Sequence, residues 1–333
     1  MQFITLGRSS LKVSRLGIGA LHFGVYLSKE EALHIVERAF DRGVNFIDTA
    51  PMYGRGMSES FIKHAVRGRR DKYVLATKVG LRPCTTPDGY FGVETVPLTA
   101  RTIRDSLEAS LKALGTDHVD LFQLHAFDET TPLDETFSAL DSVVREGKVR
   151  FIGCSNYEGW QLERVADLCS RNKLPSFVTA QAHFNLIERR AAREVLSVCA
   201  RQGVSGLINR PLARGILTGK YKWDQPLPPA SRAAESLRVR KWLEEGTLRL
   251  VADLEDWAKG RGRTMPQLAL AWLFAQKDVG AALVGVRNSD QLDDCLKAAD
   301  WDLGADLKEV DGLIEKHGLT AQVHERPPAL FEK

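Results

Sequence analysis

The sequence predicts an α/β fold in which eight parallel strands and their helices close into a (β/α)8 TIM barrel with an N-terminal β-hairpin. Three observations support this prediction: eight short apolar runs, helical patterns between them, and no linker-like or low-complexity stretch in 333 residues. Apolar strands that alternate with helices are typical of a parallel sheet buried on both faces. Eight such units favour a closed barrel, with an open doubly wound sheet as the alternative. We therefore expect residues 1–333 to form a single domain.

The first fifteen residues predict the hairpin. The runs FITLG (3–7) and LKVS (11–14) flank a turn at Arg8–Ser10. The barrel strands follow from apolar runs at RLGIGA (15–20), VNFID (44–48), YVLATK (73–78), VDLFQLH (119–125), VRFIGCS (149–155), FVTAQ (177–181), VSGLIN (204–209) and AALVG (281–285).

The first helix has clear start and stop signals. Ser28 and Glu31 form a capping box, apolar residues from Ala32 to Phe40 repeat at helical spacing, and Gly43 stands where a helix ends. The segment 99–114 behaves alike, with Thr99 as a cap and Gly115 after the last turn. Further helices are predicted at 133–146, 157–171, 191–202, 243–259 and 264–276.

Two long loops follow the third and seventh predicted strands, at 80–98 and 220–240. In a barrel they would lie on the face that carries the active site. The polar, Pro-rich tail ERPPALFEK (325–333) has little helical signal.

Composition excludes several classes of function. The net charge is only +3, from 46 basic and 43 acidic residues, which favours neither a nucleic-acid nor a membrane surface. No run of 18 apolar residues and no secretory-signal pattern is present. The five cysteines are scattered, without a C-x-x-C pair, which predicts reduced thiols, a cytoplasmic location and no metal site.

Four ionisable residues stand at the ends of neighbouring predicted strands: Asp48, Tyr53, Lys78 and His125. Residues at these positions of a barrel face the active site. Each of them taken alone is more often a cap, a packing residue or a solvated side chain. We expect the four to converge, because perturbed groups gathered in one place are the mark of a site.

The chemistry of this set is proton transfer. A buried lysine pairs with a buried aspartate, and a neighbouring ammonium should lower the tyrosine pKa from about 10. A histidine can polarise a carbonyl group or align the substrate. The four residues could give a proton to a carbonyl oxygen, but only a cofactor could supply hydride.

Motifs along nearly the whole chain resemble those of the aldo-keto reductases. They are LGIGALHFG (16–24), FIDTAPMYGRGMSES (46–60), ATKVG (76–80), DLFQLHAFD (120–128), RFIGCSNY (150–157), AQAHFNL (180–186), PLARGILTGKY (211–221) and VGVRNSDQL (284–292). The resemblance implies a metal-free barrel that uses NADP(H). It implies a tyrosine proton donor, Tyr53, tuned by Lys78 and Asp48, with His125 orienting the carbonyl.

The same resemblance implies a set of cofactor-binding positions. They are Gly19, Ala20, Asp48, Ser155, Asn156, Gln181, Asn209, Arg210, Leu212, Gly215, Leu217, Gly219, Gly285, Arg287, Asn288, Gln291 and Asp294. Leu212 to Gly219 would cover the pyrophosphate, and Gly285 to Asp294 would hold the adenosine end at a helix N-terminus.

Three departures from the family pattern bear on the cofactor. Asn209 and Arg210 replace the aromatic that stacks on nicotinamide in many members, so Arg210 could project into the site. Cys295 stands where an asparagine often touches adenine. Gly285 replaces a lysine that some members place against the 2′-phosphate, and Arg287 could take its role. NADP(H) is therefore favoured and NAD(H) remains possible.

The resemblance implies reversible hydride transfer between NADP(H) and an aldehyde or ketone, or the corresponding alcohol. An NAD-dependent sugar or alcohol dehydrogenase is one alternative. A regulatory subunit resembling the potassium-channel β subunits is an alternative of another class. The expected partner is a small carbonyl or alcohol substrate, with no nucleic acid and no membrane; the substrate's identity and the oligomeric state stay open.

Overall fold

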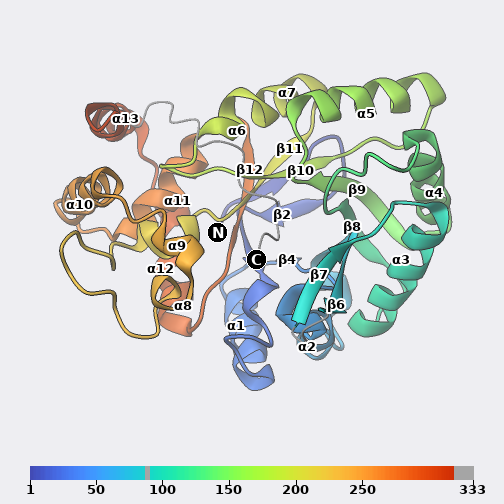
Figure 1. Cartoon of the computed structure of the whole chain (residues 1–333), viewed down its shortest axis with the longest axis horizontal. Helices are drawn as coiled ribbons and strands as arrows, with labels where there is room; N and C mark the ends of the chain where they lie inside the picture. The colour runs from blue at the N-terminus through green and yellow to red at the C-terminus, as the bar shows by residue number, and fades with distance from the viewer. Residues whose placement is uncertain (87–90, 319–333) are drawn as a thin grey trace.

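Eight parallel strands form a closed barrel (Figure 1). The computed structural model describes residues 1–86 and 91–318. Around the barrel, each strand is hydrogen-bonded to the next in the order β10, β11, β12, β3, β4, β5, β8, β9. The strands are β3 (Leu16–Gly19), β4 (Phe46–Asp48), β5 (Val74–Val79), β8 (Val119–Leu124), β9 (Val149–Ser155), β10 (Thr179–His183), β11 (Ser205–Asn209) and β12 (Val279–Val284). The predicted barrel is confirmed.

The N-terminal hairpin consists of β1 (Phe3–Thr5) and β2 (Lys12–Ser14), which pair in antiparallel fashion as predicted. Leu6, Leu11 and Val13 of this hairpin are buried in the same apolar cluster as Phe46 of β4 and Leu121 of β8. The backbone N–H of Gly7 donates to Ser205 Oγ at 2.7 Å, at the start of β11. The hairpin therefore seals the end of the barrel where the strands begin.

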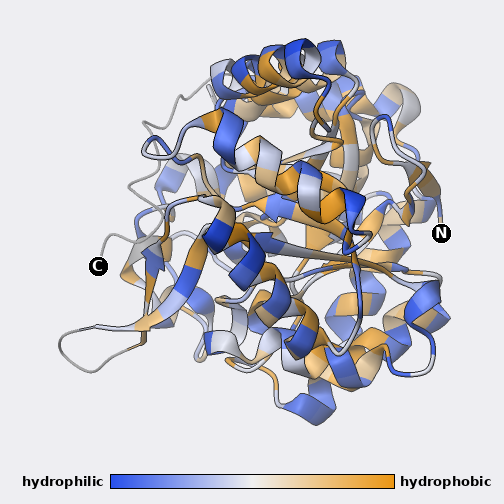
Figure 2. Cartoon of the chain, turned by 90° about the vertical axis from the view of Figure 1, so that its right-hand side faces the viewer, coloured by the Kyte–Doolittle hydropathy of each residue, from blue (hydrophilic) through white to orange (hydrophobic). Residues whose placement is uncertain are grey.

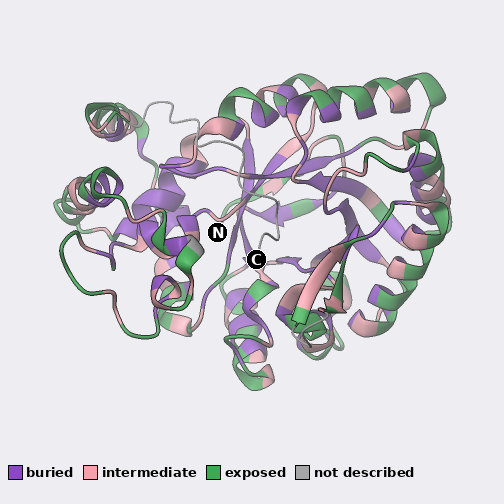
Figure 3. Ribbon diagram, in the orientation of Figure 1, coloured by how far each residue is buried: buried purple, intermediate pink, exposed green. Residues whose placement is uncertain are grey.

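Helices cover the outside of the barrel, with buried inner faces and exposed outer faces (Figure 3). Their bounds are α1 (Lys29–Asp41), α2 (Ser58–Ala65), α3 (Ala100–Leu114), α4 (Leu133–Arg145), α5 (Gly159–Asn172), α6 (Arg190–Arg193), α7 (Val195–Gln202), α8 (Arg232–Glu235), α9 (Leu237–Arg240), α10 (Glu245–Lys259), α11 (Met265–Ala275), α12 (Ser289–Leu296) and α13 (Leu307–Lys316). Figure 2 shows polar and apolar residues alternating along the outer helices, as amphipathic packing requires.

Local signals place the helix ends. Ser28 and Glu31 make both hydrogen bonds of the predicted capping box at α1. Thr99 caps α3, and Gly115 ends it in the left-handed conformation with φ 64°. These caps satisfy backbone groups that a helix end would otherwise leave unpaired.

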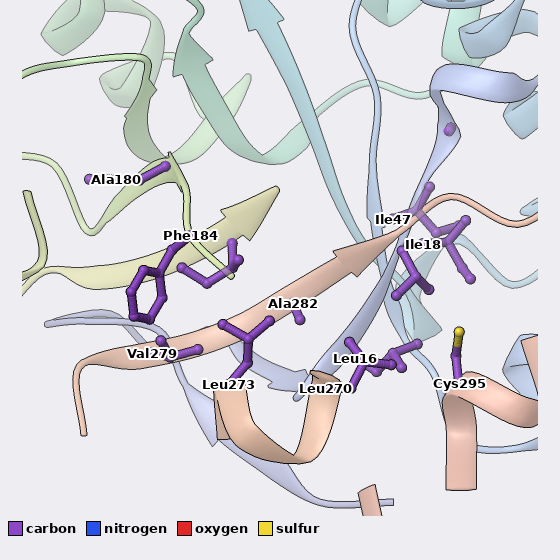
Figure 4. Close-up of a cluster of buried hydrophobic side chains, with 14 of the residues drawn as sticks. Leu16, Ile18, Ile47, Ala180, Phe184, Leu270, Leu273, Val279, Ala282 and Cys295 are labelled. Carbon is purple, nitrogen blue, oxygen red and sulfur yellow. The ribbon is translucent and has the colours of Figure 1, made fainter. Parts of the chain in front are cut away.

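The helix α11 is buried on nearly every side, because α10, α12 and β12 surround it. Leu270 and Leu273 of α11 lie beside the strand residues Val279 and Ala282 (Figure 4). Cys295 of α12 belongs to this same apolar cluster and is 2% exposed. These contacts place α12 against the barrel at the end of β12.

The two long loops contain structure that the sequence analysis did not predict. Segment 80–98 carries the antiparallel hairpin β6 (Leu81–Thr85) and β7 (Phe91–Thr95). Segment 220–240 carries the short helices α8 and α9. The tail 325–333 lies outside the described residues. Among the described helices, none has both the length and the apolar character needed to cross a bilayer.

Candidate functional site

The four predicted residues lie on three adjacent strands at one end of the barrel. Asp48 is the last residue of β4, Lys78 lies one residue before the end of β5, and His125 directly follows β8. Tyr53 begins the 3-10 turn η2 (Tyr53–Gly56) that follows β4. Because β4, β5 and β8 are neighbours in the barrel, these side chains meet at its C-terminal rim.

The turn that carries Tyr53 has room only for glycine at position 54. Gly54 has φ +60°, and a Cβ there would lie 1.7 Å from the carbonyl oxygen of Phe23. Ser58, at the start of α2, hydrogen-bonds Thr49 Oγ1 at 2.9 Å and donates to the carbonyl of Ala20 at 3.0 Å. These contacts fix the Tyr53 turn to the ends of β3 and β4.

Lys78 is the centre of the cluster. Its ammonium Nζ donates to Asp48 Oδ2 at 2.6 Å, to the carbonyl oxygen of Thr49 at 2.9 Å and to Tyr53 OH at 3.2 Å. The Lys78 side chain is fully buried. Its three donor hydrogens therefore each have an acceptor, which is how a buried ammonium is tolerated.

Two amides complete the environment of Asp48. Gln123 Nε2 donates to Asp48 Oδ1 at 2.8 Å, and Gln181 Nε2 donates to the same oxygen at 3.1 Å. Burial alone would lower the pKa of Lys78, but the charges and hydrogen bonds of Asp48 and Tyr53 outweigh burial and raise it. Lys78 is therefore a protonated ammonium held against the Tyr53 hydroxyl.

The direction of the Tyr53 pKa differs from the expectation. Burial raises the pKa of Tyr53 above its ordinary value of 10.0, and the Lys78 charge, which lowers it, does not compensate. Asp48 adds to the rise, because its negative charge also opposes a phenolate. The expectation considered the ammonium without the cost of desolvating the phenol. Tyr53 is thus a protonated phenol at neutral pH, the form that can donate a proton.

His125 lies beside the Tyr53 ring, with 5.9 Å between ring centroids and nearly perpendicular planes. Burial, and then the Lys78 charge, hold the pKa of His125 well below its ordinary value. Asn156 Nδ2 donates to the His125 carbonyl oxygen at 2.8 Å and so fixes the backbone after β8. A neutral imidazole next to the phenol can donate a hydrogen bond to a carbonyl oxygen without competing for its proton.

The predicted carboxamide contacts, Ser155, Asn156 and Gln181, lie on or after β9 and β10, next to Asn209 at the end of β11. Asn209 Nδ2 donates to Gln181 Oε1 at 3.2 Å, while the buried Asn209 Oδ1 has no partner among the described residues. The Ser155 hydroxyl accepts from Asn156 at 3.1 Å. An acceptor without a partner can take the N–H of an amide, which is compatible with a nicotinamide carboxamide here.

The segment that follows β11 is strained. Arg210, Ala213 and Arg214 have φ of 54°, 45° and 57°, in the left-handed region that non-glycine residues rarely adopt. The predicted residues Leu212, Gly215, Leu217 and Gly219 all lie in or beside its 3-10 turn η4 (Ala213–Thr218). Strain of this kind is concentrated at ligand-binding segments.

The predicted adenosine positions are described in two groups, first Gly285 with Asn288 and then Gln291 with Asp294. Gly285 is exposed beside His22, and Asn288 caps α12 through the backbone N–H of Gln291 at 2.9 Å. Gln291 Oε1 accepts from the backbone N–H of Arg287, and Asp294 accepts from Gln267 Nε2 at 2.6 Å. The side chains of Gln291 and Asp294 are thus already engaged within the protein.

Arg287 links three loops of the rim. Its guanidinium donates to the Ala230 carbonyl oxygen at 3.0 Å, lies 3.5 Å from Glu235 Oε2 and stacks on the Tyr26 ring at 3.8 Å. Gly19 and Ala20, at the end of β3, lie beside the start of this segment, because β3 pairs with β12 and a Cβ on Gly285 would lie 3.6 Å from the Gly19 carbonyl oxygen. Cys295, by contrast, is buried in the core (Figure 4), and burial raises its pKa to about 12.

One residue of the site was missed from the sequence. Gln123 lies two positions before His125 on β8, so its side chain points into the barrel beside Asp48. The signal was a polar residue inside the strand run VDLFQLH, two positions before His125 and so on the same face of the strand. No group of three or more His, Cys, Asp or Glu in the described part of the chain could hold a metal ion.

Comparison with known proteins identifies the family. A model of the "Aldo/keto reductase family" matches residues 15–315. The uncharacterized oxidoreductase YrpG of Bacillus subtilis (strain 168) is 37% identical over 316 residues, which cover 92% of this chain and 94% of YrpG. L-glyceraldehyde 3-phosphate reductase of Escherichia coli O157:H7 is 33% identical over 311 residues, covering 90% and 87% of the two chains.

A relative named as a channel subunit is as similar to this chain as the reductase of Escherichia coli O157:H7. A probable voltage-gated potassium channel subunit beta of Oryza sativa subsp. japonica is 33% identical over 308 residues, covering 90% of this chain and 92% of its own. The family match spans the whole barrel and both halves of its rim. The chain therefore belongs to the aldo/keto reductase family, whose members are NAD(P)H-dependent oxidoreductases of carbonyl and alcohol groups.

Proposed function

We propose that this protein reduces an aldehyde or ketone to an alcohol with NADP(H), and catalyses the reverse reaction on the alcohol. The observation that supports this best is the position of Lys78 Nζ, 2.6 Å from Asp48 Oδ2 and 3.2 Å from Tyr53 OH. Tyr53 donates the proton to the carbonyl oxygen, and Lys78 stabilises the phenolate that remains. His125 holds the carbonyl oxygen next to the phenol. A bound nicotinamide cofactor would supply the hydride.

The cofactor would be held by the other strands of the rim. Ser155, Asn156, Gln181 and Asn209 would bind the carboxamide end, with Gly19, Ala20 and Asp48 beside the nicotinamide. The segment from Leu212 to Gly219 would cover the pyrophosphate, and the start of α12, from Gly285 to Asp294, would hold the adenosine end. Support comes from the unpaired Asn209 Oδ1 and the strained η4 segment.

NADP(H) is proposed over NAD(H) because Arg287 lies two residues before α12, where a helix N-terminus and a guanidinium together favour a phosphate. Fluorescence titration of the protein with each cofactor tests this choice. A tenfold or greater preference for NAD(H), about 1.4 kcal/mol, would reverse it.

Two further proposals concern the chain as a whole. We propose that residues 1–333 form one domain, because the barrel closes between β3 and β12, far apart in the sequence. We also propose a cytoplasmic location, because all five cysteines are free thiols and four of them are buried.

A spectrophotometric screen at 340 nm tests the function. Each nicotinamide cofactor would be paired with aldehydes, ketones, sugars and polyols. With any substrate that the native protein turns over, we expect Tyr53→Phe to lower kcat by about 10²–10⁴-fold or more, because only the proton donor is lost. The dissociation constant of the cofactor should stay within about twofold of the native value.

Tyr73→Phe is the matched control, because Tyr73 is buried near the start of β5, at the opposite end of the barrel, and its hydroxyl has no partner among the described residues. It should leave kcat unchanged. If Tyr53→Phe reduced 4-nitrobenzaldehyde at the native rate, another group would be the acid.

A cofactor-binding regulatory subunit is the second candidate, favoured by the similarity to the potassium channel subunit beta of rice. It predicts a stable complex with a membrane protein and negligible turnover across the carbonyl panel. The buried contacts of Lys78 with Asp48 and Tyr53 favour the enzyme, because a purely structural role would not need them.

A further inference from the structure

A second cationic centre lies on the rim, across the barrel from Lys78. It consists of Arg210, directly after β11, and His183, the last residue of the adjacent strand β10. The Arg210 guanidinium Nη1 lies 3.2 Å from His183 Nδ1. The proton-transfer chemistry proposed above uses neither side chain.

The structure holds Arg210 firmly in this position. Its backbone is left-handed, with φ 54°, and its carbonyl oxygen accepts from Asn185 Nδ2 at 3.1 Å. Asn185 is itself buried, and its Oδ1 accepts from the backbone N–H groups of Ile187 and Glu188. The loop after β10 thus fixes the backbone from which the Arg210 side chain extends.

No carboxylate pairs directly with this guanidinium, and the charge of Glu188 offsets its burial only in part. Among the described residues, no Asp or Glu oxygen lies within 4.0 Å of Arg210, and the nearby Glu188 accepts from Asn185 Nδ2 at 2.9 Å instead. Burial, followed by the charge of Arg214, lowers the pKa of Arg210 to about 9. A partly desolvated cation next to other cations costs free energy unless an anion joins it.

His183 offers a second hydrogen-bond donor. Burial and the charges of Arg210 and Arg214 hold the pKa of His183 well below its ordinary value, so its ring is neutral at pH 7. Its Nδ1 can only accept from the Arg210 guanidinium, which places the ring hydrogen on Nε2. The pair therefore presents guanidinium N–H groups and one imidazole N–H.

We propose that Arg210 and His183 form a subsite for an anionic group on the substrate, a carboxylate or a phosphate, so that the preferred carbonyl compound is an acid. This inference rests on the proposed reductase function. The position supports a substrate role, because both side chains stand at the ends of the adjacent strands β10 and β11, on the same rim of the barrel as Tyr53. The resemblance implies a cofactor contact for Arg210, and this inference assigns its side chain to the substrate instead, with the cofactor phosphates further along the chain at η4 and α12. Guanidinium binds carboxylate and phosphate oxygens in the same forked geometry.

The test compares matched anionic and neutral substrates. Reduction of 4-carboxybenzaldehyde is measured against 4-carbamoylbenzaldehyde, its neutral isostere, and glyceraldehyde 3-phosphate against glyceraldehyde. We expect the native protein to favour the anionic member of at least one pair by tenfold or more in kcat/KM at low salt. The pair with the larger ratio identifies the anion as carboxylate or phosphate. Arg210→Gln should bring that ratio close to one, and Arg210→Lys should restore part of it.

Two controls separate the substrate role from other roles. Arg171→Gln removes the same charge at the end of α5, where the side chain is 75% exposed and far from the rim, and should leave the ratio unchanged. The NADPH dissociation constant should change less than twofold in Arg210→Gln. An equal loss on both members of each pair, or weaker NADPH binding, would show that Arg210 serves the cofactor or the fold instead.

Binding measurements test this inference separately from the proposed function. If no carbonyl compound is reduced, the proposed reductase function is wrong. Calorimetry with 4-carboxybenzyl alcohol and its neutral amide, with and without NADP+, then tests whether the anion subsite exists. Tighter binding of the acid in the native protein, lost in Arg210→Gln, supports the anion subsite. Equal affinities would refute it.

Discussion

At the scale of single residues, the buried ion pair of Lys78 and Asp48 dominates the site. Lys78 has its three acceptors within the barrel, and Asp48 has two amide donors besides the ammonium. A buried pair of this kind contributes little net stability compared with apolar residues, but the loss of one partner leaves an uncompensated charge. The pair is therefore maintained for chemistry and is costly to break from one side.

Lys78→Met should destabilise the protein by about 3–5 kcal/mol, because the Asp48 carboxylate stays buried without its cation. The double variant Lys78→Met with Asp48→Asn should recover part of that loss. Urea denaturation measures both, with the exposed Lys112→Met as a control that should change stability by less than about 0.5 kcal/mol. Purely additive losses would mean that the two side chains are not coupled.

The composition of this site could be predicted from the sequence, but its electrostatics could not. Strand-end positions identified Asp48, Tyr53, Lys78 and His125 because a barrel directs such residues to one rim. The rise in the Tyr53 pKa depends on how much water the phenol loses, which only packing determines. The pairing of Arg210 with His183 likewise depends on how the chain turns at the ends of β10 and β11, which no periodic pattern predicts.

At the scale of elements, Asp128 joins two of them. It follows β8, and its Oδ2 accepts from the backbone N–H of Leu98, just before α3, at 2.7 Å. Its Oδ1 accepts from the backbone and hydroxyl of Thr130 at 2.8 and 2.6 Å. Burial alone would raise the pKa of Asp128, but these hydrogen bonds outweigh it and lower the pKa to about 2. The carboxylate thus ties the loop after His125 to the start of α3.

This lowered pKa makes part of the stability depend on pH. The Asp128 contribution should be complete above the unfolded pKa, near pH 4, and disappear as the pH falls through about 2. Its size should be on the order of 1 kcal/mol, after allowance for solvent screening. Asp128→Asn should therefore destabilise the protein at pH 7 and much less at pH 2.5, as measured by urea denaturation. Asp105→Asn, whose side chain is 70% exposed, is the control, and a pH-independent difference would contradict the assignment.

Periodicity predicted the barrel strands well, yet it did not predict the hairpin of β6 and β7. Pro83 and Gly92 lie within these strands, and both residues normally argue against a strand. The hairpin forms because its two strands pair with each other outside the barrel, where each has a free edge that tolerates proline. Short helices such as α8 and α9 were missed for a related reason, since four residues show no amphipathic repeat.

At the scale of the whole molecule, the barrel has an inner core that includes the N-terminal hairpin. Leu6 is fully buried in the cluster that also contains Phe46, Leu121 and Leu207, from three barrel strands. Gly7 fits there without a side chain, because a Cβ would lie 2.3 Å from the carbonyl oxygen of Val178. The hairpin is thus part of the cooperative core rather than an appendage.

Leu6→Ala should destabilise the whole protein by about 2–5 kcal/mol, because it leaves a cavity at the sealed end of the barrel. Phe3→Ala is the matched control from the same hairpin, where Phe3 is 44% exposed, and should cost far less. Guanidinium denaturation followed by circular dichroism should show one transition shifted as a unit. A separate early transition, with the barrel midpoint unmoved, would show that the hairpin unfolds alone.

The order of strands around the barrel also separates two kinds of chemistry. Strands β4, β5 and β8 are contiguous and bear Asp48, Lys78 and, directly after β8, His125. The contiguous arc of β9, β10, β11, β12 and β3 bears the proposed anion contacts and, apart from Asp48, the proposed cofactor contacts. Evolution can therefore change the residues of one arc while those of the other stay the same. A mutant library confined to the segments after β10, β11 and β12 would vary the proposed substrate and cofactor contacts while leaving Asp48, Tyr53, Lys78 and His125 in place.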